Sequence, residues 1–252
     1  MVLFLLGLIF FMPKDFYKKT KFSLSEIFQM FTIQFFPILI IIIVVALHLF
    51  EVNIIDPSVT SWVGHDFASN IEGIEGKTVY WFSQNWIDVF VYFFVVMYIA
   101  VYPFTLWFSI FYFIFNKEKK AMKSLAYGLF LVYIITLPFY LFMPITNVYT
   151  YFNTSSALES VIPSVESFFY TTTTQNNCLP SLHTSMAILV AYCLKLTGNK
   201  RLTYFGYFVM ICIIISVIYL SIHWITDVVA GALLSIIVIM ILKRYMRENN
   251  NE

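Results

Sequence analysis

Long apolar stretches separated by short polar segments dominate the hydropathy pattern of this chain. A helix needs roughly 20 apolar residues to cross about 30 Å of hydrocarbon. By this criterion, transmembrane helices are predicted near residues 30–50, 86–115, 125–143, 183–198, 203–222 and 224–243. The stretch at 183–198 is the shortest and begins with polar residues, so its neighbours are the main reason to read it as a span. The pattern predicts an all-α fold, a polytopic membrane helical bundle with six transmembrane helices.

The N-terminal segment from Met1 to Met12 is apolar but too short to span a bilayer comfortably, and a lysine-rich stretch follows it. A signal peptide has the opposite order, with its positive region first and a small-residue cleavage site last. We therefore predict an N-terminal interfacial helix that lies on the inner leaflet. No low-complexity linker or clear internal repeat divides the chain, which indicates a single integral-membrane domain over residues 1–252.

Composition and charge narrow the class of protein further. Hydrophobic residues make up 60% of the chain and charged residues only 12%, which excludes an ordinary soluble domain. Basic residues collect in the cytoplasmic loops of membrane proteins. With the predicted spans, fourteen of the fifteen Lys and Arg residues fall on one side, and only Lys77 lies on the other. Both termini are therefore predicted to be cytoplasmic, and we expect no nucleic-acid partner.

Two histidines stand out against this apolar background: His183 in Pro-Ser-Leu-His and His223 in His-Trp-Ile-Thr-Asp. Ionisable side chains within a bilayer are costly and are usually functional. The predicted topology brings both to the extracytoplasmic face, although it rests only on hydropathy and on the positions of Lys and Arg. His48 and His65, in contrast, lack a partner at useful spacing, and we interpret them as interfacial or loop residues.

The residues around the two histidines fit nucleophilic catalysis. His223 and Asp227 are four residues apart, so on a helix the carboxylate can accept the imidazole N–H and leave the other ring nitrogen free to attack. His183 is then the candidate general acid. Ser181, with the backbone N–H groups of Leu182 and His183 at a helix start, is predicted to bind an oxyanion such as phosphate. No metal-ligand spacing is evident, and we expect neither a metal nor another cofactor.

These motifs resemble those of the type 2 phosphatidic-acid phosphatases, integral-membrane relatives of the vanadium haloperoxidases. That family has a Pro-Ser-x-His motif, followed later by a His-x-x-x-Asp motif. The matching residues here are Pro180, Ser181, His183, His223 and Asp227. The resemblance implies a six-helix membrane core, with its motifs within about residues 125–245 of this chain. It also implies metal-independent phosphoryl transfer through a phosphohistidine, and lipid phosphate esters as substrates.

The chain departs from that family at three cationic positions. Thr136, Met143 and Val217 stand where the family has a Lys and two Arg residues, although the neighbouring Pro144 and Ser216 are retained. Charge-assisted hydrogen bonds contribute about 1.5 to 3 kcal/mol each, so a phosphomonoester dianion would lose several kcal/mol of binding here. The motifs look more like those of inositol phosphorylceramide synthases and sphingomyelin synthases. Those enzymes use phosphodiester donors, which carry one negative charge.

Several interpretations stay open from the sequence. Lys77 is a candidate substitute cation for phosphate binding, although a solvated loop lysine is the commoner situation. We favour an inositol phosphotransferase-like enzyme that moves a phosphorylated headgroup between lipids. A phosphatase for phosphatidate or a polyprenyl (di)phosphate is the competing enzyme, and in either case the partners are the lipid phosphate ester and the membrane lipids. A small proton-coupled transporter is the alternative from another class, but the predicted spans contain few polar residues for a transport path.

Overall fold

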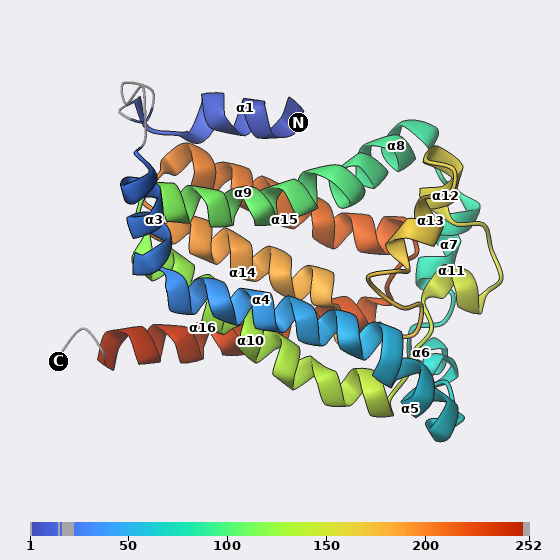
Figure 1. Ribbon diagram of the computed structural model, residues 1–252. Coiled ribbons are helices and arrows are strands. Elements are labelled where there is room, and N and C mark those ends of the chain that lie inside the picture. The colour runs from blue at the N-terminus through green and yellow to red at the C-terminus, as the bar shows by residue number, and fades with distance from the viewer. Residues whose placement is uncertain (1, 15, 17–22, 249–252) are drawn as a thin grey trace.

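The computed structural model describes residues 2–14, 16 and 23–248. Within that part of the chain, the regular secondary structure is helical apart from one isolated bridge between Ile145 and Asn177. The long helices lie side by side in one bundle, and shorter helices gather at one end of it (Figure 1). The all-α prediction is confirmed for the described residues.

The bundle is built from long helices that two π-helical turns extend. Its helices are α4 (Phe35–Phe50), α8 (Asp88–Val96), α9 (Tyr102–Phe115), α10 (Lys119–Phe142), α14 (Leu182–Leu196), α15 (Lys200–Tyr219) and α16 (Ile225–Glu248). The π-turns are η1 (Glu51–Ile55), which continues α4 into α5 (Asp56–Val63), and η2 (Met97–Val101), which continues α8 into α9. The other helices are α1 (Val2–Phe11), α3 (Leu24–Ile33), α6 (Ala68–Glu75), α7 (Thr78–Gln84), α11 (Val148–Tyr151), α12 (Ala157–Val161) and α13 (Val165–Phe169).

Within the described residues, five helical segments are long and apolar enough to cross a membrane. They are Phe35–Val63, Asp88–Phe115, Lys119–Phe142, Lys200–Tyr219 and Ile225–Arg247. These segments make the chain an integral membrane protein, and they correspond to five of the predicted spans. The predicted span at 183–198 corresponds to α14, which has 15 residues and is therefore only about 22 Å long. The count of six spans is not confirmed, because α14 is shorter than the hydrocarbon thickness.

The short helix α14 lies at the centre of the bundle. It packs against α10, α15 and α16, and eight of its side chains are buried. Gly128 of α10 permits this packing, since a Cβ at that position would lie 2.5 Å from Leu189 of α14. Non-helical backbone at membrane depth is tolerated where protein surrounds it. The helix can therefore begin inside the bundle, among the longer helices (Figure 1).

The first span differs from the predicted range 30–50 at both of its ends. Gln34 separates α3 from α4, and its side-chain amide donates to the carbonyl of Phe113 at 2.8 Å. Hydropathy alone did not reveal this break, because apolar residues flank it on both sides. At the other end the helix continues through η1 to Val63, although it carries the buried carboxylates of Glu51 and Asp56. Because these carboxylates face protein instead of lipid, they can lie within the helix, which therefore continues beyond its predicted end.

The N-terminal helix α1 lies across α9 (Figure 1). Phe4 contacts Phe111 edge to face, with ring centroids 4.9 Å apart. The outward side chains of α1, such as Val2 and Ile9, are apolar and exposed. Its interfacial location stays a prediction, and the lysines within residues 18–21 that helped to motivate it lie outside the described residues.

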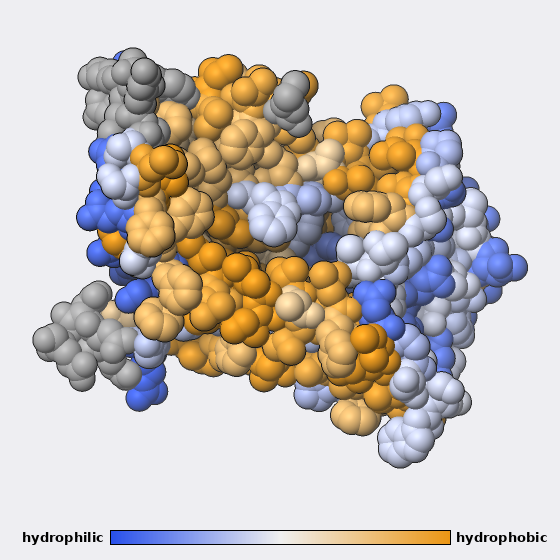
Figure 2. Space-filling view, viewed as in Figure 1, coloured by the Kyte–Doolittle hydropathy of each residue, from blue (hydrophilic) through white to orange (hydrophobic). Residues whose placement is uncertain are grey.

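Along the length of the bundle, the surface changes from hydrophilic at one end to apolar in the middle and hydrophilic again at the other end. Figure 2 shows a broad apolar band across the middle of this face and hydrophilic residues towards both ends. Basic residues collect at the left-hand end of Figure 1, where α9 meets α10, α14 meets α15, and α16 ends: Lys117, Lys119, Lys120, Lys123, Lys195, Lys200, Arg201, Lys243, Arg244 and Arg247. Lys77 lies at the other end, before α7. The charge asymmetry agrees with the predicted topology, and the orientation in the membrane stays a prediction.

Candidate active site

The start of α14 is fixed to two neighbouring helices. Ser181 is the N-cap residue, and its side-chain oxygen accepts a hydrogen bond from the amide of Thr184 at 3.3 Å. The amide of Ser181 donates to the backbone carbonyl of Asp227 at 2.9 Å, which ties α14 to α16. The Tyr140 hydroxyl of α10 donates to the carbonyl of Pro180 at 2.8 Å. The position of His183, two residues after the cap, follows from these contacts.

The start of α16 holds the second motif. Nδ1 of His223 lies 3.3 Å from Oδ2 of Asp227, and the same oxygen accepts from the amide of Trp224 at 2.9 Å. His223 is 4% exposed and Asp227 is fully buried. Glu75 of α6 caps the helix from outside, because its carboxylate accepts from the amide of Ile225 at 2.9 Å and from the next amide. With Asp227 ionised, the shared proton lies on Nδ1, and Nε2 of His223 carries a free lone pair.

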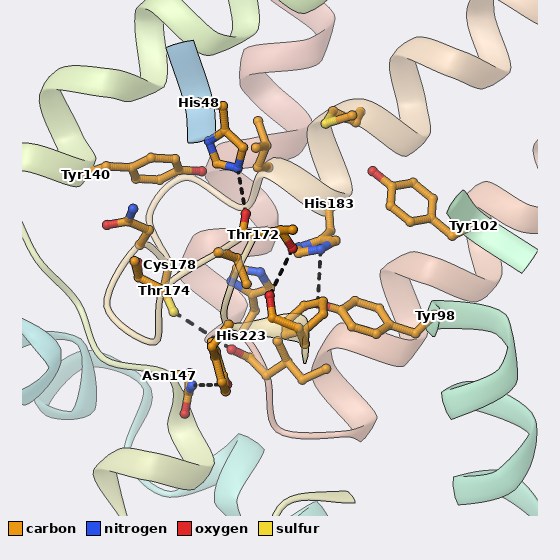
Figure 3. Close-up of a pocket in the computed structure, with 17 residues that line it drawn as sticks. His48, Tyr98, Tyr102, Tyr140, Asn147, Thr172, Thr174, Cys178, His183 and His223 are labelled. Carbon is orange, nitrogen blue, oxygen red and sulfur yellow. Dashed lines mark hydrogen bonds between the residues drawn. The ribbon is translucent and has the colours of Figure 1, made fainter. Parts of the chain in front are cut away.

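His183 and His223 meet in one cavity of about 210 Å³ (Figure 3). Their ring centroids are 5.8 Å apart, and Nε2 of His183 lies 3.0 Å from the hydroxyl oxygen of Tyr98 in η2. The two helix starts approach closely at Gly231, where a Cβ would lie 2.5 Å from the carbonyl oxygen of Ser181. The structure therefore brings together the two histidines that the sequence singled out.

The cavity wall is polar but mostly neutral. No Lys, Arg, Asp or Glu side chain of the described residues lines it. Its hydrogen-bonding groups, apart from the histidines, are hydroxyls, side-chain amides and one thiol: Tyr98, Tyr102, Tyr140, Asn147, Tyr170, Thr172, Thr173, Thr174, Asn177 and Cys178. The cations that are missing at Thr136, Met143 and Val217 therefore have no Lys or Arg replacement on this wall.

The predicted phosphate-binding residues lie in different places. Lys77 does not line the cavity, because α7 holds it on the outer surface with Nζ 6.0 Å from the ring centroid of Phe152. The structure therefore does not bring Lys77 to the cavity wall, and its role as a substitute cation stays a prediction. The Ser181 hydroxyl is buried as a helix cap and does not line the cavity either, and phosphate binding by this group stays a prediction. Leu182 does line the cavity.

The structure also corrects the interpretation of His48. This residue lines the cavity from α4, with Nε2 3.0 Å from the carbonyl oxygen of Thr172 and Nδ1 3.5 Å from the carboxylate of Glu51. It is not an isolated boundary residue, because the helix continues into η1 and places Glu51 on the next turn. His65, in contrast, is exposed between α5 and α6, where its ring contacts Phe67 edge to face.

The site agrees with the comparison to known proteins. Residues 77–241 match a sequence model of the PAP2 superfamily, the superfamily of the type 2 phosphatidic-acid phosphatases. The chain belongs to the PAP2 superfamily. No curated protein and no solved structure matches it. The superfamily indicated by the two histidine motifs is thus confirmed, whereas the synthase-like branch within it stays a prediction.

As a PAP2 enzyme, the chain is a membrane-embedded lipid phosphatase or phosphotransferase. A second cavity, of about 370 Å³, lies among α4, α9, α10 and α14 and has a mostly apolar wall. It shares His48, Thr172, Leu182 and Met186 with the histidine cavity. On the same face, Figure 2 shows a hollow between α4 and α9. This arrangement suits a PAP2 substrate, because a lipid presents an apolar chain next to a polar phosphate.

A metal-ligating set of side chains also occurs in the PAP2 site. One potential ligand atom from each of Cys178, His223 and Asp227 lies within 4.8 Å of the others. Sequence spacing gave no sign of this set, because the fold brings the cysteine to the pair. Burial raises the pKa of the Cys178 thiol well above its usual range, and the thiol points at the carbonyls of Gln175 and Ile222. The protonated thiol is a poor metal ligand, so this set does not favour a metal centre.

Sequence reasoning missed Tyr98, Tyr140 and His48 as members of the site. The chain has 17 Tyr and 28 Phe residues, so a single aromatic ring in an apolar stretch does not stand out in the sequence. The hydroxyl groups of Tyr98 and Tyr140 were the signal that could have separated them from Phe. A Tyr within a span needs a hydrogen-bond partner, whereas a Phe does not.

Proposed function

We propose that this PAP2 protein is a lipid phosphotransferase that moves a phosphorylated headgroup from one lipid to another through a phosphohistidine on His223. The arrangement of its histidines carries this proposal. Nδ1 of His223 faces Asp227 at 3.3 Å, and the ring of His183 lies 5.8 Å away in the same cavity. One imidazole is oriented for attack, and the other lies where it can exchange a proton with the leaving group.

In the first half-reaction, Nε2 of His223 attacks the phosphorus of a lipid phosphodiester. The P–O bond to the donor lipid breaks, and His183 gives a proton to the leaving oxygen, which departs as an alcohol. The phosphorylated headgroup stays on His223 through a P–N bond. Asp227 stabilises the positive charge that develops on the ring, because its carboxylate accepts the Nδ1 proton.

In the second half-reaction, His183 acts as the base. It accepts the proton of an acceptor hydroxyl, whose oxygen attacks the phosphorus, and the P–N bond to His223 breaks. The two histidines return to their initial protonation states, so no further reactant or metal is required. Water in place of the acceptor lipid would give hydrolysis by the same steps, which is why acceptor binding decides between transferase and phosphatase.

The absence of Lys and Arg from the described cavity wall supports a phosphodiester donor over a phosphomonoester. Neutral hydrogen bonds contribute about 0.5 to 1.5 kcal/mol each, roughly half the contribution of charge-assisted ones. Lys and Arg are absent from the described wall, so its donors are neutral hydroxyl and amide groups, the helix start of α14 and the histidines. Such a wall suits a single negative charge better than two.

Assays in lipid vesicles test this proposal. Purified protein is given phosphatidylinositol with ceramide in one arm and phosphatidate without an acceptor in the other. We expect headgroup transfer to ceramide to exceed phosphate release from phosphatidate, and we expect EDTA to change neither rate. Rapid phosphate release without an acceptor would replace the transferase by a phosphatase, and activity that EDTA abolishes and a metal restores would contradict the metal-independent mechanism. His65→Ala, at an exposed residue far from the cavity wall, is the matched control for the histidine variants.

We further infer that the cavity faces the extracytoplasmic side and that both termini are cytoplasmic. The basic residues at the end of the bundle opposite the cavity support this orientation, because such residues collect on the cytoplasmic side. A protease-sensitive tag at the C-terminus should resist digestion in intact cells and be cleaved after permeabilisation. Cleavage in intact cells would reverse the orientation.

A further inference from the structure

His48 is a third histidine at the active cavity, and it comes from a part of the chain outside the PAP2 match. It lies in the last turn of α4, whereas the match covers residues 77–241. Figure 3 shows its ring near the segment that contains Thr172, on the opposite side of that segment from His223. The ring lines both the histidine cavity and the apolar cavity beside it. A lipid that occupied both cavities would pass this side chain.

The contacts of His48 determine its protonation. Nε2 lies 3.0 Å from the carbonyl oxygen of Thr172, and a carbonyl can only accept, so Nε2 carries a proton. Nδ1 lies 3.5 Å from Oε2 of Glu51. Neither of these two atoms has a hydrogen-bond partner among the described residues, so their contact is favourable when the ring is an imidazolium that forms an ion pair with the carboxylate. The geometry therefore fits an imidazolium–carboxylate pair.

The burial of Glu51 supports the same conclusion. Its side chain is fully buried, and buried carboxylates in proteins are almost always paired. Oε1 accepts from the side-chain amide of Asn177 at 3.2 Å, and within the described residues the ion pair of Glu51 is the one with His48. Glu51 does not line the cavity, whereas His48 does. The pair thus directs its positive end towards the substrate and its negative end into the protein.

Other titratable groups around the pair come from three elements. Asp56 on the same extended helix adds negative charge near Glu51, and its carboxylate is bonded to the hydroxyl of Thr60 at 3.2 Å. The ring of Tyr133 on α10 contacts His48 edge to face, with centroids 6.0 Å apart. His183 on α14 is within electrostatic range of His48. None of these groups supplies a second cation, except when His183 itself is protonated.

We propose that the imidazolium of His48, held by Glu51, is the resident cation of the phosphate site and acts where the superfamily uses Lys and Arg. Its Nε2–H group is engaged by the carbonyl of Thr172, so we expect it to act on the substrate mainly through its charge. A preorganised charge at a water-poor site stabilises an oxyanion without reorganisation. This inference rests on the proposed function in that the anion is the phosphate of the lipid substrate.

Binding of inorganic orthovanadate, an analogue of phosphate in transfer, tests the proposal apart from turnover. His48→Gln keeps a side-chain N–H for the Thr172 carbonyl but removes the charge, and His48→Lys keeps a charge. We expect His48→Gln to weaken vanadate protection against thermal unfolding by about 10- to 100-fold in concentration. We expect His48→Lys to recover most of that loss, and His65→Gln to behave as wild type.

Glu51→Gln provides the second arm, because it keeps the histidine and removes the carboxylate that is paired with it. We expect it to weaken vanadate binding as much as His48→Gln does, with no further loss in the double variant. If His48→Gln does not fold, the vanadate affinity of Glu51→Gln alone tests the proposal. Wild-type affinity for vanadate in a folded His48→Gln or Glu51→Gln protein would overturn the proposal, since hydrogen bonding without charge would then suffice.

Vanadate binding also separates this inference from the proposed function. If wild-type protein binds vanadate in a His48-dependent way but transfers no headgroup, the cation site stands and the reaction is another one. If wild-type protein transfers headgroups and His48→Gln does so with unchanged KM and kcat, the reaction stands and His48 is not its cation. Each result overturns one statement and leaves the other in place.

Discussion

The two helix starts that form the active cavity differ in the charge of the groups that cap them. A helix N-terminus carries roughly half a positive charge from its unpaired amides. At α16, two carboxylates already occupy those amides: Asp227 accepts from Trp224, and Glu75 accepts from Ile225. At α14, the cap is the neutral hydroxyl of Ser181. An anionic substrate will therefore be attracted to the start of α14 and repelled from the start of α16.

The partners of the two histidines differ in the same way. Nδ1 of His223 faces a carboxylate at 3.3 Å, whereas Nε2 of His183 faces the phenol of Tyr98 at 3.0 Å. A carboxylate makes an imidazole more basic and more nucleophilic, whereas a phenol leaves it free to gain and lose a proton. The difference in partners favours the proposed roles, in which His223 attacks and His183 exchanges a proton.

Replacing the nucleophile should have the largest effect. We expect His223→Ala to lower headgroup transfer by more than about 10⁴-fold, because no P–N bond can form. Folding should be retained, since the ring makes no hydrogen bond besides the one to Asp227 among the described residues. Acid-quenched protein incubated with labelled donor lipid should retain label in wild type and in His65→Ala, but not in His223→Ala. A labelled His223→Ala protein would contradict the assignment.

Replacing the proton donor should have a smaller and substrate-dependent effect. We expect His183→Ala to slow transfer by about 10²- to 10⁴-fold for donors with poor leaving groups, the usual contribution of general acid–base catalysis. A nitrophenyl ester of the same headgroup needs no protonation of its leaving group and should form the phosphoenzyme at a rate much closer to wild type. Equal losses with both donors would show that His183 does not act as the acid.

Removing the Tyr98 hydroxyl, which contacts Nε2 of His183, should have a smaller effect than replacing either histidine. We expect Tyr98→Phe to lower kcat by about 3- to 10-fold with little change in KM, which is the effect of one neutral hydrogen bond. Tyr102→Phe is the matched comparison, since the Tyr102 hydroxyl has no hydrogen-bond partner among the described residues. A larger effect of Tyr102→Phe than of Tyr98→Phe would contradict the role given to the Tyr98 contact.

The smallest effect on headgroup transfer should come from replacing Ser181, the neutral N-cap residue of α14. We expect Ser181→Ala to destabilise the protein by about 1 kcal/mol, as loss of an N-cap usually does, and to lower the midpoint of thermal unfolding. The rate of headgroup transfer should fall only if the first turn of α14 moves, because the hydroxyl does not line the cavity. A loss of activity as large as that of His183→Ala, without a change in unfolding, would mean that the hydroxyl binds substrate directly.

The spans and the two histidine motifs could be predicted from sequence because each depends on local properties. Hydropathy marks a helix that contacts lipid, and four-residue spacing places His223 beside Asp227. The pair of His48 and Glu51 was hidden, because its importance depends on contacts with Thr172 and Asn177 far along the chain. The place of Lys77 away from the cavity wall could not be predicted for the same reason, since it depends on how α7 packs.

The two π-turns affect how relatives of this protein can be aligned to it. A π-turn holds one residue more than an α-turn, and one residue corresponds to about 100° of rotation around a helix axis. Glu51 lies in η1 and Tyr98 lies in η2, so both depend on that extra residue for their direction. A relative with an uninterrupted α-helix in either place would present a different side chain to the cavity, even if every histidine motif aligned without a gap.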